Sequence, residues 1–439
     1  MSAVLDFPVK PEARDYLARF ARDAGEPAWL AARRQQAMTR FAETGFPNRK
    51  NEGWRYLDLQ PLEGRALLPA RAAARPDATA LRAQLAHFVQ PGSAARLVLV
   101  DGRFAPELST IDCPAGVWVA PMAQAIAERP ELVQAGIEAA TGDAHPFAAL
   151  NVAFFADGFV LDVAPGIVLE QPIEIVHLAS GATEASFHTR GLVALGEGGS
   201  ASLVETYAGE GRYWRNDVVT VRLAAGAALT RTVLVEEAAD TVHLGQLDAT
   251  LGAKARFAGF MLLLGGRRVR HEANVCLAGE GASCEINGGF LVHGNDEANI
   301  VTAIDHATPG GRTRELIKGV AAGRGHGAFQ GRIVVREHAQ KTDAHQLSRN
   351  LIIGRRAVID TKPELEIYAD DVKCSHGASV GDLDEAALFY LRARGIPAEE
   401  ARRMLIDGFL REAVESVDDL ATRTHLLRRL AGRLDTLEE

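Results

Sequence analysis

The sequence predicts a mainly β protein in which a β-helix, or solenoid, forms the core between an N-terminal and a C-terminal α-helical domain. Helical periodicity dominates from about residue 10 to 90 and again after Gly381, whereas short apolar runs broken by glycine fill the segment between them. Small residues also recur in that segment at a constant spacing. We therefore predict domains at residues 1–94, 95–380 and 381–439.

Prolines and apolar spacing predict the helices of the first domain. Pro11 and Pro27 suit the first turn of a helix, and apolar residues follow each of them at spacings of three and four. Asp77 to Val89 adds one more amphipathic helix. In the β region that follows, only Pro121 to Arg129 and the segment 131–140 have a helical pattern longer than two turns.

The β region has an internal period. Four alanines, each shortly after a glycine and at the start of a strand-like run, are equally spaced along the chain: Ala201, Ala228, Ala255 and Ala282. A fixed period in the range of about 20 to 50 residues is typical of a solenoid, in which each coil buries its apolar face against its neighbours. A β-sandwich has no reason to keep such a period. Chance recurrence in an alanine-rich sequence is the alternative. If the period is real, the four alanines occupy equivalent corners.

Polar residues midway between these alanines predict a second turn in each coil. They lie at Arg215 to Asp217, around Asp240 and at Arg267. Each repeat would then hold two strands and two turns.

After Gly381 the pattern predicts a helical hairpin and a last helix. The first helix runs from Leu383 to Arg394, the second begins at Pro397 with glutamates in its first turn, and the last runs from Leu420 to Leu434. The apolar residues of the second helix fall on or near one stripe: Met404, Leu405, Gly408, Phe409 and Val414. Such a stripe is usually core, and a partner-docking face is the alternative.

Composition excludes several classes of function. With 48 basic and 57 acidic residues, the net charge of −9 argues against nucleic acid as the main partner. The sequence contains no run of about 18 apolar residues, so it predicts no membrane span. The first residues lack the pattern of a secretion signal. Four scattered cysteines suit neither a disulfide framework nor a Cys-x-x-Cys zinc site, so we expect a cytoplasmic protein.

Common catalytic and nucleotide-binding motifs are absent from the sequence. No Gly-x-x-x-x-Gly-Lys-Ser/Thr, Gly-x-Ser-x-Gly or His-Glu-x-x-His segment occurs. The glycine-rich stretches 196–199 and 323–327 precede no helix and are interpreted as coil corners. Carboxylates near Glu364 and Asp370 would suit a polysaccharide enzyme, but such enzymes act outside the cell and use aromatic rings, which make up only 6% of this chain. A self-sufficient enzyme is therefore not indicated.

The segment from Asp371 to Gly377 carries the most suggestive chemistry. In an extended strand Cys374 and His376 point to the same face, which places a thiol beside an imidazole. The pair could supply two ligands to a soft or borderline metal, a thiol nucleophile with its base, or only a buried cysteine beside a hydrogen-bonded histidine. The spacing leaves all three open.

The other cysteines and the histidines of the late coils have simpler interpretations. We expect structural roles for these cysteines and hydrogen bonds to the backbone for these histidines: Cys113, Cys276, Cys284, His293, His306, His326, His338 and His345.

Three segments resemble the SufB/SufD family of iron–sulfur cluster assembly proteins. They are Thr342 to Gly354, Asp360 to Gly381 and Ala387 to Pro397, and the central one contains Asp-Val-Lys-Cys-Ser-His-Gly. Pro47 to Tyr56 resembles the N-terminal signature of the family. The resemblance covers essentially the whole chain and is most specific between Lys341 and Pro397.

The resemblance implies a right-handed parallel β-helix between helical domains, and a non-enzymatic scaffold in a complex of SufB, SufD and the ATPase SufC. In that complex SufD pairs with SufB, and each binds one SufC. SufB-like chains carry a cysteine in the strand before Leu-Ile-Ile-Gly and a glutamate at the place of His376. Many of them also have a cluster of cysteines toward the N-terminus. This chain has Leu347 and Ser348 in that strand and no cysteine before Cys113, so it resembles the SufD branch.

The resemblance also implies the site. A transient iron–sulfur cluster would be shared with SufB, with His376 as the more important ligand and Cys374 as the weaker one. The residues predicted to bind SufC are Arg394, Leu405 and Phe409. Those predicted to bind SufB are Ile352 and Ile367. A reduced flavin in the complex and a homodimer of the isolated chain stay open. The alternative is a cytosolic metal- or thiol-dependent enzyme that uses Cys374 and His376 alone.

Overall fold

The computed structural model describes residues 9–21, 25–59, 62, 67–70, 77–138, 145–182 and 184–437. Its helical elements are α1 (Ala13–Arg19), α2 (Ala28–Thr44), η1 (Glu52–Trp54), α4 (Ala78–Ala86), η2 (Pro106–Leu108), α5 (Met122–Glu128), α6 (Pro130–Glu138), α7 (Pro146–Phe154), α8 (Glu385–Ala393), α9 (Ala398–Val414) and α10 (Leu420–Leu434). Its strands are β1 (Ala95–Val100), β2 (Arg103–Phe104), β3 (Val117–Pro121), β4 (Asp157–Val163), β5 (Ile173–Ser180), β6 (Ala185–Leu195), β7 (Ser200–Glu210), β8 (Tyr213–Leu223), β9 (Ala228–Glu236), β10 (Val242–Leu251), β11 (Arg256–Gly265), β12 (Arg268–Leu277), β13 (Ser283–Val292), β14 (Glu297–His306), β15 (Arg312–Ala322), β16 (His326–Val335), β17 (Asp343–Ile353), β18 (Val358–Ile367) and β19 (Lys373–Gly381).

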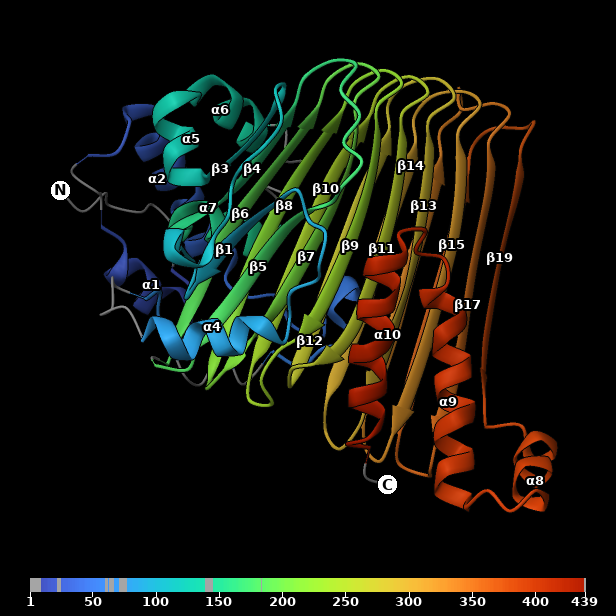
Figure 1. Cartoon of the computed structure of the whole chain (residues 1–439). Helices are drawn as coiled ribbons and strands as arrows, with labels where there is room; N and C mark the ends of the chain where they lie inside the picture. Colours follow the sequence, from blue (N-terminus) through green and yellow to red (C-terminus); the bar gives the residue numbers. More distant parts are fainter. Residues whose placement is uncertain are drawn as a thin grey trace.

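The strands form two long parallel sheets that face each other along one solenoid (Figure 1). The 10-stranded sheet, here the first sheet, has the order β19-β17-β15-β13-β11-β9-β7-β5-β1-β2. The 9-stranded second sheet has the order β18-β16-β14-β12-β10-β8-β6-β4-β3. Because each coil adds one strand to each sheet, the predicted mainly β solenoid with helices at both ends is confirmed.

The coils differ in length. In the first sheet Gly259 pairs with Ile286 of the next coil, and this step along the chain equals the spacing of the four alanines. The step from Glu315 to its partner Gln346, nearer the C-terminal end of the solenoid, is longer. The constant period that the sequence suggested is therefore wrong for the later coils.

The predicted stacking of the four alanines is correct only for Ala255 and Ala282. The residues that follow them, Arg256 and Ser283, lie opposite each other in β11 and β13. Ala228 pairs with Arg256, the residue after Ala255, so it lies one place further along its coil. Ala201 lies one place further again. The equal spacing hides a drift along the corner, because the coils from β7 to β9 and from β9 to β11 are each one residue longer than that spacing.

Alternate residues of the strands point into the solenoid, and most of them form one continuous apolar core along it. The corners between strands are tight turns. Gly198 and Gly323 adopt φ values of 64°, in the left-handed region where glycine is favoured. Each lies between two strands and precedes no helix, so both glycine-rich stretches are coil corners as predicted.

Helices α1, α2 and α7 pack together over the first coils, with α5 and α6 beside them (Figure 1). Helix α7 was not predicted. Seven of its nine residues are buried, from Phe147 to Ala153, so it lacks the polar face that makes a helix recognisable in a sequence. Helices α5 to α7 lie between residues 95 and 380, and the predicted domain boundaries stay a prediction.

Helices α9 and α10 cover the outer face of the first sheet over β11, β13 and β15, while α8 projects beyond the solenoid (Figure 1). The last helix has the predicted bounds. The buried stripe of α9 differs from the predicted one: Ala401, Ile406, Leu410, Ala413 and Val414. Met404 is instead 47% exposed, because the sheet selects a face one residue away from the stripe suggested by the sequence.

Candidate functional site

The solenoid ends at β18 in the second sheet and β19 in the first, and neither strand has a further neighbour in the described chain. Large apolar side chains on these strands and just after β18 are between 41% and 60% exposed: Val358, Ile367, Tyr368 and Val380. An unpaired strand edge with exposed apolar side chains is a surface for pairing with another chain. We call β18, β19 and these side chains the open end.

Cys374 and His376 lie two residues apart on β19 and share its inward face, as the sequence predicted. Cys374 is half-buried and packs against the solenoid core. His376 is exposed, because no coil follows to cover it. Burial raises the pKa of the Cys374 thiol, so the protonated form, which is neither a good nucleophile nor a good metal ligand, is favoured.

The outward face of β17, the neighbour of β19, holds His345 in a hydrogen-bonded position. Its Nδ1 lies 2.5 Å from Oγ of Ser375, and its Nε2 lies 2.9 Å from Oδ1 of Asp343. His326 similarly meets Oδ2 of Asp360 at 2.7 Å. The partners of these histidines are side chains rather than the backbone groups that we expected from the sequence.

The open end offers few metal ligands from this chain. Cys374 and His376 supply two donors, and the described residues contain no group of three or more His, Cys, Asp or Glu side chains arranged to hold a metal ion. Iron–sulfur clusters and tetrahedral metals normally take more protein ligands than two. A cluster bound at the open end would need donors from a second chain.

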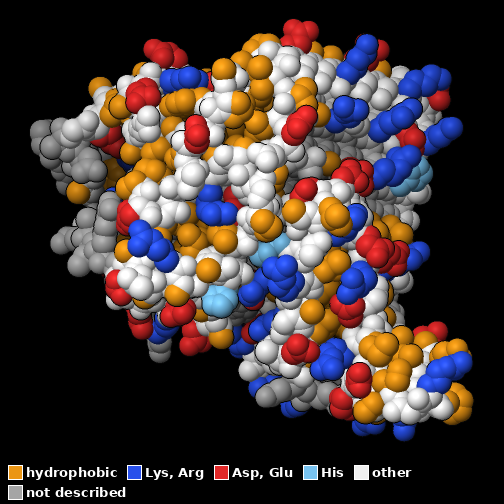
Figure 2. Space-filling model, in the orientation of Figure 1, with side chains coloured by type: hydrophobic (Ala, Val, Ile, Leu, Met, Phe, Trp, Pro, Cys, Tyr) orange, Lys and Arg blue, Asp and Glu red, His pale blue; other side chains and the backbone are white. Residues whose placement is uncertain are grey.

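A second exposed apolar surface lies on α8 and the start of α9. Phe389, Tyr390 and Met404 are 73%, 56% and 47% exposed. Figure 2 shows apolar side chains gathered on this projecting part of the molecule. The guanidinium of Arg394 stacks 3.7 Å from the ring centre of Tyr390, which places this predicted partner-binding residue at the exposed surface.

Leu405 and Phe409 are half-buried and lie closer to the sheet. Nζ of Lys318, on β15, lies 4.3 Å from the centre of the Phe409 ring and donates to the Phe409 carbonyl oxygen at 3.0 Å. Lys318 also forms an ion pair with Glu412. Phe409 therefore takes part in the contact that fastens α9 to the solenoid. The SufC-binding role of both residues stays a prediction.

The two isoleucines predicted for the SufB interface differ in exposure. Ile367 is 41% exposed on the edge strand β18. Ile352 is half-buried against the solenoid core near the end of β17, where it also lines a small pocket beside Leu388. Ile367 is thus the more accessible of the two, and the interface itself stays a prediction.

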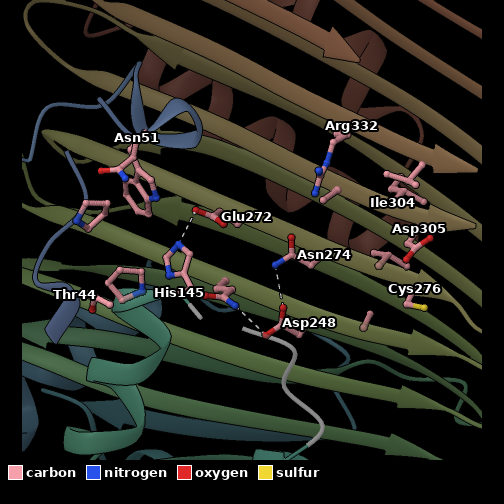
Figure 3. A pocket seen from close by; sticks show the side chains of 18 of the residues that line it. Thr44, Asn51, His145, Asp248, Glu272, Asn274, Cys276, Ile304, Asp305 and Arg332 are labelled. Atoms are coloured by element: carbon pink, nitrogen blue, oxygen red, sulfur yellow. Dashed lines mark hydrogen bonds and ion pairs between the residues drawn. The ribbon is translucent and has the colours of Figure 1, made fainter. Parts of the chain in front are cut away.

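A groove of about 1210 Å³ runs over the outer face of the second sheet, beneath the segment after α2 (Figure 3). His145 reaches Glu272 at 3.4 Å between Nε2 and Oε1, and Asn274 donates to Oδ1 of Asp248 at 3.0 Å. Sequence reasoning missed this groove. No local signal could have shown it, because its walls come from β10, β12, β14, β16 and distant N-terminal residues.

The carboxylates Glu272 and Asp248 of the groove are paired with neighbouring side chains. Burial disfavours a charge on Glu272, but Arg270 and His145 outweigh that effect and hold its pKa below the usual range. Burial and the charge of Asp305 raise the pKa of the Cys276 thiol. These side chains form neither an activated nucleophile nor a metal site.

Inside the first coils lies a cluster of buried ion pairs. Nε of Arg215 lies 2.7 Å from Oε1 of Glu237, and Arg231 binds both carboxylate oxygens of Glu205 at 2.5 and 2.9 Å. Tyr207 donates to Glu205 at 2.8 Å. All five side chains are buried inside the solenoid.

The sequence prediction for this cluster was wrong. Arg215 and Asp217 were predicted to lie in a turn, and both lie in β8 with their side chains buried inside the solenoid. Three consecutive polar residues suggest a turn, whereas a buried ionic network is recognisable only when partners from other coils are known.

Two family models match this chain. The model of the SufBD core domain of the SUF system for FeS cluster assembly matches residues 177–409, and the model of the SufBD N-terminal region matches residues 18–175. The chain belongs to the SufBD family. The core match runs from β5 into α9, so it includes Cys374 and His376 of this SufBD protein.

Named relatives of this SufBD protein are similar over most of their length. The iron–sulfur cluster assembly protein SufD of Escherichia coli is 31% identical over 408 residues, which cover 91% of this chain and 92% of that protein. A SufBD family protein of Synechocystis is 28% identical, over 93% and 90%. SufD of Bacillus subtilis is 26% identical, over 92% and 94%.

Family membership gives this SufBD chain a role in SUF iron–sulfur cluster assembly and confirms the resemblance seen in the sequence. These relatives are named as assembly proteins, which is consistent with a non-catalytic scaffold. None of its described helices has the length and apolar character needed to cross a membrane.

Proposed function

We propose that this chain is a scaffold subunit of the SUF assembly complex that pairs with a SufB-type chain through the open end and binds the ATPase SufC through α8 and α9. The observation that carries the proposal is the free outer edge of β18 and of β19, with apolar side chains up to 60% exposed on or beside these strands. Such an edge invites uncontrolled pairing unless a partner covers it. ATP hydrolysis belongs to SufC, and this chain responds to it.

The cargo of the complex is a nascent iron–sulfur cluster held between the two chains. His376 is the main donor from this side, since its imidazole is exposed at the open end. Cys374 is the weaker donor, because it is half-buried and its thiol holds its proton. The partner completes the ligand set, which two side chains alone cannot fill.

Movement of SufC reaches this site through α9. Lys318 ties the middle of α9 to β15, and β15 is hydrogen-bonded to β17, which in turn pairs with β19. A force on α8 and the exposed start of α9 is therefore transmitted to the last coils. Shifting the two solenoids against each other would open the shared site to iron and sulfur.

A metal- or thiol-dependent enzyme that uses Cys374 and His376 alone is the second candidate, favoured by their shared face on β19. It predicts turnover or bound iron in the isolated chain. The scaffold proposal predicts neither, and assigns both properties to the complete complex.

The test is co-expression of this chain with its SufB and SufC, anaerobic purification, and measurement of bound iron and sulfide. His376→Ala should leave the complex assembled and lower both by at least about tenfold, which is the scale of losing one essential interaction. Cys374→Ala should be milder. His345→Ala is the matched control, since this histidine lies on the outward face and is bonded to Asp343 and Ser375. Full iron and sulfide in the His376→Ala complex would refute the proposed site.

The SufC surface is tested separately with Phe389→Asp, a change on the exposed face of α8. The variant should fold like the parent chain and lose SufC in co-purification while keeping SufB. Undiminished binding of SufC would exclude α8 as its docking site.

A further inference from the structure

Three inward-facing side chains lie in one row behind the open end. Glu315 on β15 is in register with Gln346 on β17, and Gln346 is in register with His376 on β19. Glu315 and Gln346 are 4% and 2% exposed, whereas His376 ends the row at the surface. Neighbouring strands of a sheet are about 4.8 Å apart, so each side chain of the row lies within reach of the next.

The amide of Gln346 is held in one orientation. Its Nε2 donates to Oε2 of Glu315 at 2.7 Å. From the second sheet, Gly331 provides the space that this amide occupies, since a Cβ at position 331 would lie 2.0 Å from Nε2. Any side chain at position 331 would push the amide away from Glu315.

The oxygen of the same amide is a buried acceptor that has no hydrogen-bond partner among the described residues. Above its raised pKa of about 7 Glu315 is ionised and can only accept hydrogen bonds, so the amide nitrogen faces it, as the structure shows. The amide oxygen is then left to accept from a donor other than Glu315, and the next coil offers one. The inward-facing side chain in register there is His376.

We propose that Gln346 is a positioning residue for His376: its Oε1 accepts a hydrogen bond from one ring nitrogen and leaves the other, unprotonated nitrogen free to bind cargo iron. Glu315 and Gly331 act through Gln346 by fixing the amide. Metal-binding histidines commonly donate their second N–H to such an acceptor, which sets the tautomer and the ring orientation. This inference rests on the proposed role of His376 as a ligand.

The hydrogen bond is measurable without metal, by ¹⁵N NMR of the full chain labelled at histidine. The ring signals of His376 are those that disappear in His376→Ala. At alkaline pH, where imidazole is neutral, the parent chain should show one tautomer, with widely separated shifts for the two ring nitrogens. In Gln346→Met, which keeps the length of the side chain and removes the acceptor, the two shifts should converge. Unchanged shifts in the folded variant would overturn the proposal.

Asn350→Leu is the matched control on β17, because Asn350 is also buried and inward-facing but bonds to Ser348 and lies opposite Val380. It should leave the His376 shifts unchanged. If Gln346→Met does not fold, Glu315→Gln serves instead. It removes the charge that fixes the amide, and the shifts should again converge. Separated shifts in folded Glu315→Gln would equally overturn the proposal.

The complete complex separates this inference from the proposed function. Gln346→Met should lower the iron content of the anaerobically purified complex by about tenfold, as loss of a supporting hydrogen bond does at metal sites. Normal iron in the Gln346→Met complex alone refutes the positioning role, while normal iron in the His376→Ala complex refutes the ligand role on which it rests.

Discussion

At its first end the solenoid finishes in short antiparallel strands with helices packed beside them, whereas at its other end the outer edges of the parallel strands β18 and β19 pair with no described strand. β2 lies antiparallel to β1, β3 lies antiparallel to β4, and α5 and α7 pack against the first coils. At the open end, β18 and β19 have a neighbour on one side only. The two ends of one solenoid therefore differ: helices of the same chain pack against the first coils, whereas the last coil leaves a strand edge that the proposed partner would cover.

The charges follow the same division. Near the closed end the side chains of Arg215 and Glu237 are both 0% exposed, whereas the Arg336–Asp305 pair in the late coils is 57% and 33% exposed. Buried pairs are costly to break, and exposed pairs contribute little. Breaking the Arg215–Glu237 pair should therefore cost more stability than breaking the Arg336–Asp305 pair.

The largest effect is expected at the buried pair. Arg215→Met leaves Glu237 charged inside the solenoid, and removing one partner of a buried pair costs about 3 to 5 kcal/mol of unfolding free energy. Urea unfolding measures the loss. Arg336→Met is the control of the same chemistry at an exposed site, and it should unfold at the parent's urea concentration. Equal unfolding of the two variants would contradict the division between the ends.

Two glutamates should give opposite dependences of stability on pH. Burial disfavours the charge on Glu237, but Arg215 and His243 outweigh it and lower its pKa to about 2. Burial raises the pKa of Glu315, in the late coils, to about 7. An unfolded glutamate titrates near pH 4.3, roughly.

The stability from Glu237 is therefore present above that value and is lost as the pH falls toward 2. Folded Glu315 binds its proton more tightly than the unfolded chain does, so stability falls as the pH rises toward 7. Glu237→Gln should remove the loss on the acid side, and Glu315→Gln the loss between about pH 4.3 and 7. Urea unfolding across this range measures both. A slope unchanged by its substitution would contradict the assignment.

Ala255→Leu should have an intermediate effect. Ala255 is fully buried at a corner stacked on that of Ala282, so three added carbons overpack two coils and cost about 1 to 3 kcal/mol. Ala378→Leu, the same change at an exposed position of β19, should leave the unfolding midpoint of the isolated chain unchanged. An Ala255→Leu variant as stable as the parent would show that the corners are loosely packed.

Ile367→Lys should have the smallest effect on folding and the clearest effect on pairing. The side chain is 41% exposed, so the isolated chain should lose no more than about 0.5 kcal/mol, while the charge should separate it from SufB in co-purification. Ile352→Lys is the comparison, since this half-buried residue should lower stability as well. Circular dichroism distinguishes misfolding from lost pairing. Intact pairing by folded Ile367→Lys would remove β18 from the interface.

The sequence by itself determined the solenoid, its helical ends, and the shared face of Cys374 and His376. The solenoid was indicated by small residues that recur at equal spacing, the helical ends by a period of about 3.6, and the shared face by the period of two in a strand. The bounds expected for the last helix, about Leu420 to Leu434, agree with α10, and in the structure the side chain of Asp419 caps its first turn. Helix α7 was missed, because burial on all sides removes that pattern.

Only the tertiary structure decided which residues of different coils meet. The step along the chain from Glu315 to Gln346 is not the same as the step from Gln346 to His376, so no fixed period could have aligned the three. The same holds for Arg215 and Glu237, which the sequence did not pair. Register depends on the length of each turn and on packing between coils, and one residue of error moves a side chain to the opposite face. That alignment is what places a buried amide behind an exposed histidine.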